Sequence, residues 1–174
     1  MNSLLKVIAI VLSLISTLEL SAQLDTIHWL PPVHGRLAPW TFDNYIYVST
    51  PSINPVQYTI KVPGGITLDS GVVSNSNPIK YFLGANLNNP IFTDTTQLNV
   101  ILQNKGILFS STAPCYVSYR CNAYDSSQSL QATIVSLKGN IALGKNFRIG
   151  GIKNLIGGIY RSSFFSMTAT EDST

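Results

Sequence analysis

The sequence has 174 residues, 11 basic and 8 acidic side chains, a net charge of +3 and only 11% charged residues. This length suits one modest domain, and a count of 2 cysteines excludes a disulfide-dense miniprotein. The small basic surplus argues against nucleic acid as a partner, because such binding needs clustered side chains that neutralise phosphates.

Residues 1–22 are typical of a secretory signal peptide, with a nearly uninterrupted apolar run at 7–20 and small residues after it. We expect cleavage after Ala22 or Gln23, which makes the protein secreted or cell-surface. The alternative is a membrane anchor, which needs about 20 apolar residues. Glu19 interrupts this run, and no later stretch is apolar enough, so we expect no membrane span after cleavage.

Short strand-like runs separated by turns fill the rest of the chain. The runs at 44–50 and 56–62 are rich in aromatic and β-branched residues, each ends at a proline, and we expect them to be neighbouring strands. Further strands are expected at 66–73, 79–83, 106–110, 115–123, 130–137, 147–152 and 164–170. Such regular spacing predicts an all-β fold, an antiparallel β-sandwich.

One segment, 93–106, departs from this pattern. Leu98, Ile101 and Leu102 have helical spacing, and Gly106 suits the position that follows a helix C-terminus. We predict one short helix here. The alternative is a loop with a hydrophobic staple, since an isolated helix of this length is marginal without packing.

The two cysteines lie in the run 115–123, where side chains should alternate between faces. The predicted faces are Cys115, Val117, Tyr119 and Cys121 on one side, and Tyr116, Ser118 and Arg120 on the other. The two sulfurs should then be about 20 Å apart, whereas a disulfide tolerates Cα atoms at most about 7 Å apart. We expect two free, buried thiols. A zinc site with His28 and His34 matches no compact ligand spacing, so no metal or cofactor is predicted.

A candidate ligand-binding patch surrounds the Pro-Pro pair at 31–32. Its residues are His28, Trp29, His34 and Arg36. Trp and Arg are favoured in binding sites, and adjacent prolines fix how they are presented. The alternative is that Trp29 plugs one end of the sandwich, as large aromatic side chains near a domain edge often do.

Local catalytic motifs are absent from the sequence. The prediction is therefore a non-catalytic binding module. Two alternatives stay open: a secreted hydrolase acting on polysaccharide, whose distant acids converge, and a pure structural spacer. A basic stretch could attract an acidic partner. Neighbouring strand positions point to opposite faces, however, so we expect these basic side chains to be solvated separately and not to form one patch. The residues of this stretch are Lys138, Lys145, Arg148, Lys153 and Arg161.

Short stretches along the chain resemble, in order, the N-terminal region of large secreted Bacteroidota proteins with a gliding-motility-associated C-terminal domain. They are LDTIHWLPP (24–32), YIYVSTP (45–51), GIL (106–108), LKG (137–139), ALG (142–144) and FRIG (147–150). From about Gly139 onward, 147–148, 164–165 and 169–174 also resemble the start of the IgGFc-binding-protein N-terminal domain. Antibody binding does not follow from that name.

This resemblance implies an adhesin-like, β-rich protein exported by type IX secretion, with no catalytic residues. The implied organisation is a signal peptide at 1–22, a β-sandwich module at 23–138, and final strands at 139–174. A surface glycan or a protein is the expected kind of ligand. Because family members are usually longer, we expect a truncated reading frame that would continue into further β domains; a short soluble paralogue is the alternative. A truncated chain should leave an open edge on its last strand.

Overall fold

The computed structural model describes residues 23–34, 41–85, 89–93, 95–97, 99–123, 131–146 and 166–170. Its strands are β1 (Leu24–Leu30), β2 (Val33–His34), β3 (Thr41–Ser49), β4 (Val56–Lys61), β5 (Thr67–Val73), β6 (Ile79–Gly84), β7 (Phe92–Thr93), β8 (Ile107–Ala123) and β9 (Gln131–Ser136). The helical elements of these ranges are two 3-10 turns, η3 (Thr95–Gln97) and η4 (Asn140–Ala142). The predicted all-β fold class is confirmed. Within the same ranges, no helix has the length and apolarity that a membrane crossing requires.

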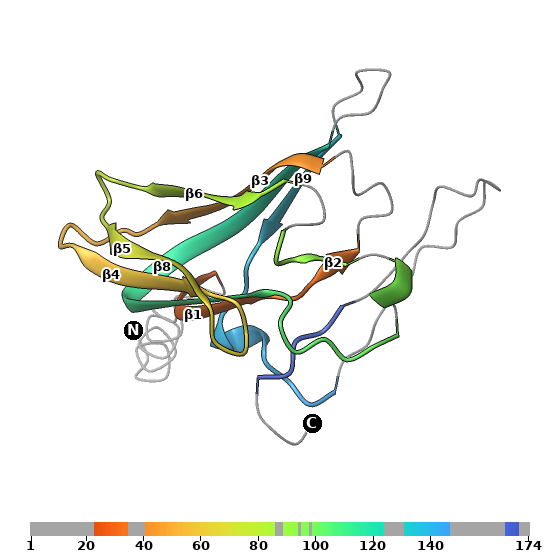
Figure 1. Ribbon diagram of the computed structural model, residues 1–174. Coiled ribbons are helices and arrows are strands. Elements are labelled where there is room, and N and C mark those ends of the chain that lie inside the picture. Colours follow the sequence, from red (N-terminus) through yellow and green to blue (C-terminus); the bar gives the residue numbers. More distant parts are fainter. Residues whose placement is uncertain are drawn as a thin grey trace, which may run out of the picture.

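Strand β8 organises the sheet. Seven of the described strands form one antiparallel sheet in the order β5-β4-β8-β3-β6, and β1 and β9 also pair with β8. The first part of β8 pairs with β1 and β4, and its last part pairs with β3 and β9. Figure 1 shows β8 passing from the lower group of strands to the upper group. The predicted sandwich therefore consists of two halves of one curled sheet, continuous through β8.

Residues 111–114 of β8 form the corner between these halves. Asp25 pairs with Cys115 and Ile27 pairs with Ser110, so these four residues of β8 lie opposite a single residue of β1. This mismatch is a pronounced β-bulge. Side chains satisfy the backbone groups that the ladder leaves unpaired: the Gln57 N–H donates to Thr112 Oγ1 at 3.1 Å, and Thr50 Oγ1 donates to the Pro114 carbonyl at 2.8 Å. Serine, threonine and proline are therefore suited to this corner, where the strand changes partners.

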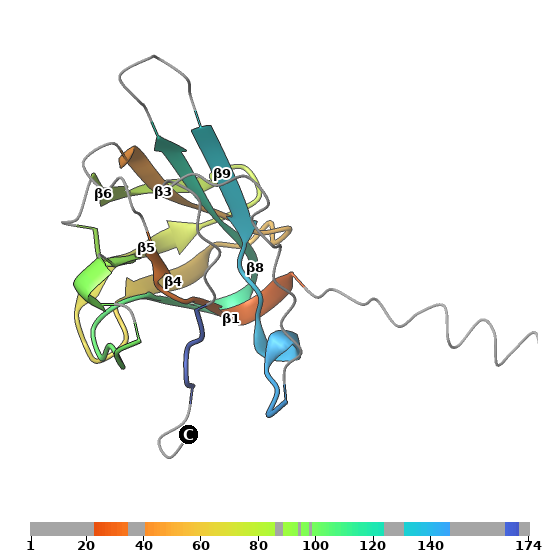
Figure 2. The same cartoon turned by 90° about the vertical axis from the view of Figure 1, so that its right-hand side faces the viewer.

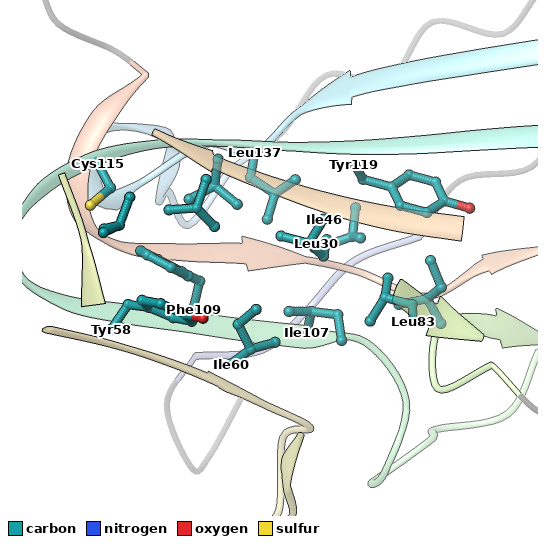
Figure 3. Close-up of a cluster of buried hydrophobic side chains, with 14 of the residues drawn as sticks. Leu30, Ile46, Tyr58, Ile60, Leu83, Ile107, Phe109, Cys115, Tyr119 and Leu137 are labelled. Atoms are coloured by element: carbon teal, nitrogen blue, oxygen red, sulfur yellow. The ribbon is translucent and has the colours of Figure 1, made fainter. Parts of the chain in front are cut away.

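The hydrophobic core lies between the two halves of the sheet. Ile60 and Phe109 come from the lower half, and Ile46 and Tyr119 from the upper half (Figure 3). All four side chains are at most 1% exposed. Burying one such side chain stabilises the fold by about 1.5–3 kcal/mol.

A buried polar connection joins three neighbouring strands of the upper half, β8, β3 and β6. The Tyr119 hydroxyl donates to Asn44 Oδ1 at 2.8 Å, and Asn44 Nδ2 donates to the Gly84 carbonyl at 3.0 Å. Burial raises the pKa of the Tyr119 hydroxyl, so it stays a proton donor at every ordinary pH. The network fixes the register of β3 and β6 at this end of the sheet.

The segment after β9 is tied back to β1 through Asp25. The Asp25 carboxylate accepts hydrogen bonds from the Asn140 backbone N–H at 2.7 Å and from Asn140 Nδ2 at 3.2 Å. Gly139 is required here because a Cβ at this position would collide with the Asp25 side chain. Figure 2 shows η4 beneath β9 and beside β1. Residues 139–142 therefore contact the first strand of the module.

Three expectations about single elements are wrong. The runs 44–50 and 56–62 are not neighbours, because β8 lies between β3 and β4. The runs 106–110 and 115–123 belong to one strand, β8. Residues 166–170 of the expected last strand have no strand structure.

The expected helix at 93–106 shrinks to the 3-10 turn η3 among the described residues. Ile101, which would have belonged to its apolar face, is 92% exposed, so this side chain provides no packing that would stabilise a helix. Gly106 has a positive φ of 101°, but it directly precedes β8 instead of following a helix C-terminus.

Candidate functional site

The predicted ligand patch is not assembled as one surface. His28 and Trp29 are consecutive in β1, so their side chains point to opposite faces. His28 is fully buried and Trp29 is partly exposed. His34 belongs to β2, where it pairs with Thr93 of β7. Its side chain and Arg36 lie outside the described residues.

His28 is part of the interior of the fold, where it forms hydrogen bonds and packs against a core ring. Its Nε2 lies 3.0 Å from the Asp25 carbonyl oxygen and 2.9 Å from the Cys115 carbonyl oxygen. Since both partners are acceptors, Nε2 carries the proton and donates to both. The ring meets Phe109 edge to face at 5.8 Å between centroids. His28 thus joins β1 to β8 just past the corner, and a ligand has no access to it.

Cys115 and Cys121 are free and buried, as predicted. They share the inward face of β8 with Val117 and Tyr119, and the residues between them alternate outward. Burial raises the pKa of both thiols. Neither cysteine is therefore placed for nucleophilic chemistry at neutral pH.

A group of neighbouring side chains is exposed to solvent on the outward side of β8 and of the strands beside it. We define the outer face as the solvent-facing side of the upper half, over β6, β3 and β8. Its principal side chains are Tyr45 and Tyr47 of β3, Lys80 and Phe82 of β6, and Tyr116 and Arg120 of β8. The strand register places them in adjacent rows: Phe82, Tyr45 and Arg120 in one, and Lys80 and Tyr47 in the next.

Aromatic rings form a continuous strip along the outer face. The Tyr45 ring lies 5.2 Å from the Phe82 ring and 6.1 Å from the Tyr47 ring, between centroids. Phe82 is 48% exposed and Tyr116 is 44% exposed. Exposed aromatic rings of this kind offer large contact area with little rotamer entropy to lose.

Each cation of the outer face lies over a tyrosine ring. Lys80 Nζ is 3.9 Å from the Tyr45 centroid, and Arg120 Cζ is 4.5 Å from the Tyr47 centroid. Such cation–π contacts at exposed sites contribute about 0.5–1 kcal/mol each. They hold the two charged groups close to the sheet.

An open groove of about 430 Å³ adjoins this strip. Its side-chain donors and acceptors are hydroxyl, amide and guanidinium groups, contributed by Gln23, Tyr47, Ser49, Tyr116, Ser118, Arg120 and Ser136. None of the residues that line it is acidic. The groove can therefore contact a polar ligand through many hydrogen-bonding groups and two tyrosine rings.

The acids that a hydrolase would need are dispersed in the described part of the chain. Asp69 of β5 accepts a hydrogen bond from the Tyr58 hydroxyl at 2.8 Å. Burial and this bond raise the pKa of the Tyr58 hydroxyl. Asp43 is on β3, in the other half of the sheet. Asp125 lies outside the described residues, as do Arg148, Lys153 and Arg161 of the basic stretch, while Lys138 and Lys145 are exposed.

No family model, curated protein or solved structure matches this chain.

The sequence pattern did not indicate the outer face as a candidate site. The predicted patch followed the unusual composition around the Pro-Pro pair at 31–32, which included the core residue His28. A signal for the outer face was nevertheless present: strict alternation in 44–50 places Tyr45 and Tyr47 opposite the buried Ile46 and Val48.

Proposed function

We propose that this chain is an exported, non-catalytic module of an adhesin-like protein, acting in adhesion or surface architecture. The N-terminal pattern at 1–22 supports export, and the ordered resemblance along the chain supports the adhesin-like class. The ligand is a surface glycan or a protein, bound at the outer face.

The aromatic strip of the outer face is the observation that carries this proposal. Tyr45 contacts both Phe82 and Tyr47 on a sheet face whose other side is the core. Aromatic side chains are enriched at binding interfaces relative to the rest of a protein surface. The rigid strands of the sheet also present the rings in fixed positions, which reduces the entropy lost when a ligand binds.

Export is tested by expressing the full chain in a bacterial host that has the general secretion pathway. Mass spectrometry of the exported product should show a new N-terminus after Ala22 or Gln23. Recovery of the intact chain from the cytosol, with its first residues retained, would refute the localisation.

Binding is tested on arrays of glycans and of surface proteins with the exported product. The double variant Tyr45→Ala/Tyr47→Ala should lose at least about tenfold in affinity, since exposed aromatic anchors dominate binding energy. Ile53→Ala is the matched control, because Ile53 is 81% exposed and lies in the loop between β3 and β4.

A hydrolysis assay on the same glycans separates this module from a secreted enzyme. We expect no turnover. Turnover that disappears in Asp43→Asn or Asp69→Asn would replace the proposal with the hydrolase, and absence of both binding and turnover would favour a spacer.

A further inference from the structure

The outer face carries two cations, Arg120 and Lys80, and one acid, since the partly exposed Asp43 alternates outward on β3 with Tyr45 and Tyr47. Arg120 borders the groove and Lys80 lies beyond Tyr47, while the lining of the groove contains no acid. Among the described residues, neither cation forms an ion pair with a carboxylate. Both side chains are exposed, so their charges are available to an anion from solution.

The contact with the Tyr47 ring restrains Arg120 for such an anion. A guanidinium that lies over a ring keeps its N–H groups at the edge of its plane, where they form a fork that matches a carboxylate or a sulfate. The Tyr47 ring holds this group at 4.5 Å, which reduces the freedom that Arg120 would lose on binding. An ordinary surface arginine has no such restraint.

The remaining groove residues favour an acidic polysaccharide over other anionic ligands. The hydroxyl groups of Ser49, Ser118 and Ser136 and the amide of Gln23 are neutral partners for ligand hydroxyl groups. The Tyr116 ring, which is 44% exposed, provides flat apolar area for the C–H face of a pyranose. A nucleic acid would instead need more cations than these two.

We infer that the outer face binds an acidic polysaccharide, whose carboxylate or sulfate groups are recognised by Arg120, with Lys80 adding attraction over a longer range. This inference rests on the proposed binding function and names the class of ligand. Uronates and sulfated sugars share this chemistry.

The experiment measures affinity of the exported full chain for three polymers: polygalacturonate, chondroitin sulfate and neutral dextran. At low salt, at least one acidic polymer should bind about tenfold or more tightly than dextran, and the binding should weaken as salt is added. The two acidic polymers distinguish carboxylate from sulfate recognition.

Variants then connect the binding to Arg120. Arg120→Gln should reduce affinity for the acidic polymer about tenfold, and Arg120→Lys should recover only part of it, because an ammonium lacks the bidentate fork. Lys61→Gln is the matched control: it removes one exposed charge from β4, in the other half of the sheet. Thermal unfolding of each variant confirms that the fold is retained.

The inference and the proposed function fail in different ways. Equal affinity for dextran and for the acidic polymers, lost in Tyr45→Ala/Tyr47→Ala, would overturn the acidic ligand and keep the binding module. Acidic-polymer binding unchanged in Arg120→Gln would overturn the role of Arg120. A chain that binds neither the polymers nor any arrayed ligand through this face would overturn both.

Discussion

Tyr119 and Tyr47 belong to paired strands, yet they face opposite sides of the same half of the sheet. Tyr119 is 1% exposed, and its hydroxyl is held by Asn44. Tyr47 is partly exposed, and its neighbours are cations and other aromatic rings. One residue type therefore has two roles here: on the inward side it holds the strands together, and on the outward side it offers contact area. Alternation along β3 and β8 is the physical cause of the difference.

The largest effect should follow from removing the inward tyrosine. Tyr119→Ala should lower the free energy of unfolding by about 3–5 kcal/mol, because it opens a cavity and leaves Asn44 Oδ1 without its donor. Tyr47→Ala should lower it by about 1 kcal/mol or less, since it mainly removes exposed contacts. Urea unfolding measures both values, and equal losses would contradict the distinction between the two faces.

The next effect concerns the backbone where β8 begins. Gly106 has φ 101°, and a Cβ there would lie 2.8 Å from the Leu30 carbonyl oxygen. Gly84 is the matched control, because it has φ 107° and nothing within 4 Å of the same position. Both substitutions by alanine carry the strain of a positive φ, about 1–2 kcal/mol.

Gly106→Ala should cost at least about 1 kcal/mol more than Gly84→Ala, because the carbonyl of β1 must also move away. The same urea titration compares the two variants. If they lose equal stability, the close approach of β1 to the start of β8 does not constrain the sheet.

The fold class and the two faces of β8 could be predicted from the sequence because both depend on local alternation. Cys115 and Cys121 on the inward face, with Arg120 opposite, needed only the period of a strand. The strand order could not be predicted this way. It depends on β8 continuing through the corner at 111–114, where local signals indicate a break.

The candidate site was missed for a related reason. Outward rings on β3 become one surface only when β6 and β8 lie beside that strand, and these pairings join residues about 40 and 75 positions apart. Composition near 28–36 is a local signal and cannot report such neighbours. The burial of His28 likewise depends on Cys115 and Phe109, which are distant in the sequence.

A smaller, pH-dependent effect tests the contact between β1 and the segment after β9. Partial burial would raise the pKa of Asp25, but hydrogen bonds from the backbone of Asn140, Thr26 and Ile27 outweigh it and lower this pKa below its ordinary value of 3.8. The folded state therefore prefers the charged carboxylate. The resulting stability is fully present above about pH 3.8 and is lost as the pH falls through the lowered value.

Asp25→Asn should remove this pH dependence. The variant should be less stable than the parent protein at pH 7, and the difference should shrink below about pH 3.8, where the parent carboxylate takes up its proton. Urea midpoints measured from pH 7 to pH 2 give both curves. A constant difference across this range would show that the carboxylate charge contributes nothing to this contact.

The smallest effect on stability is expected on the outer face itself. Arg120→Gln should change the free energy of unfolding by no more than about 1 kcal/mol, since the side chain is exposed and the substitution removes one cation–π contact. The same substitution should cost about tenfold in affinity for an acidic polymer. Stability and binding would then be carried by opposite sides of one strand, inward by Tyr119 and outward by Arg120. If Arg120→Gln instead unfolds the protein at a clearly lower urea concentration, the guanidinium belongs to the scaffold, and the outer face is a second packing surface.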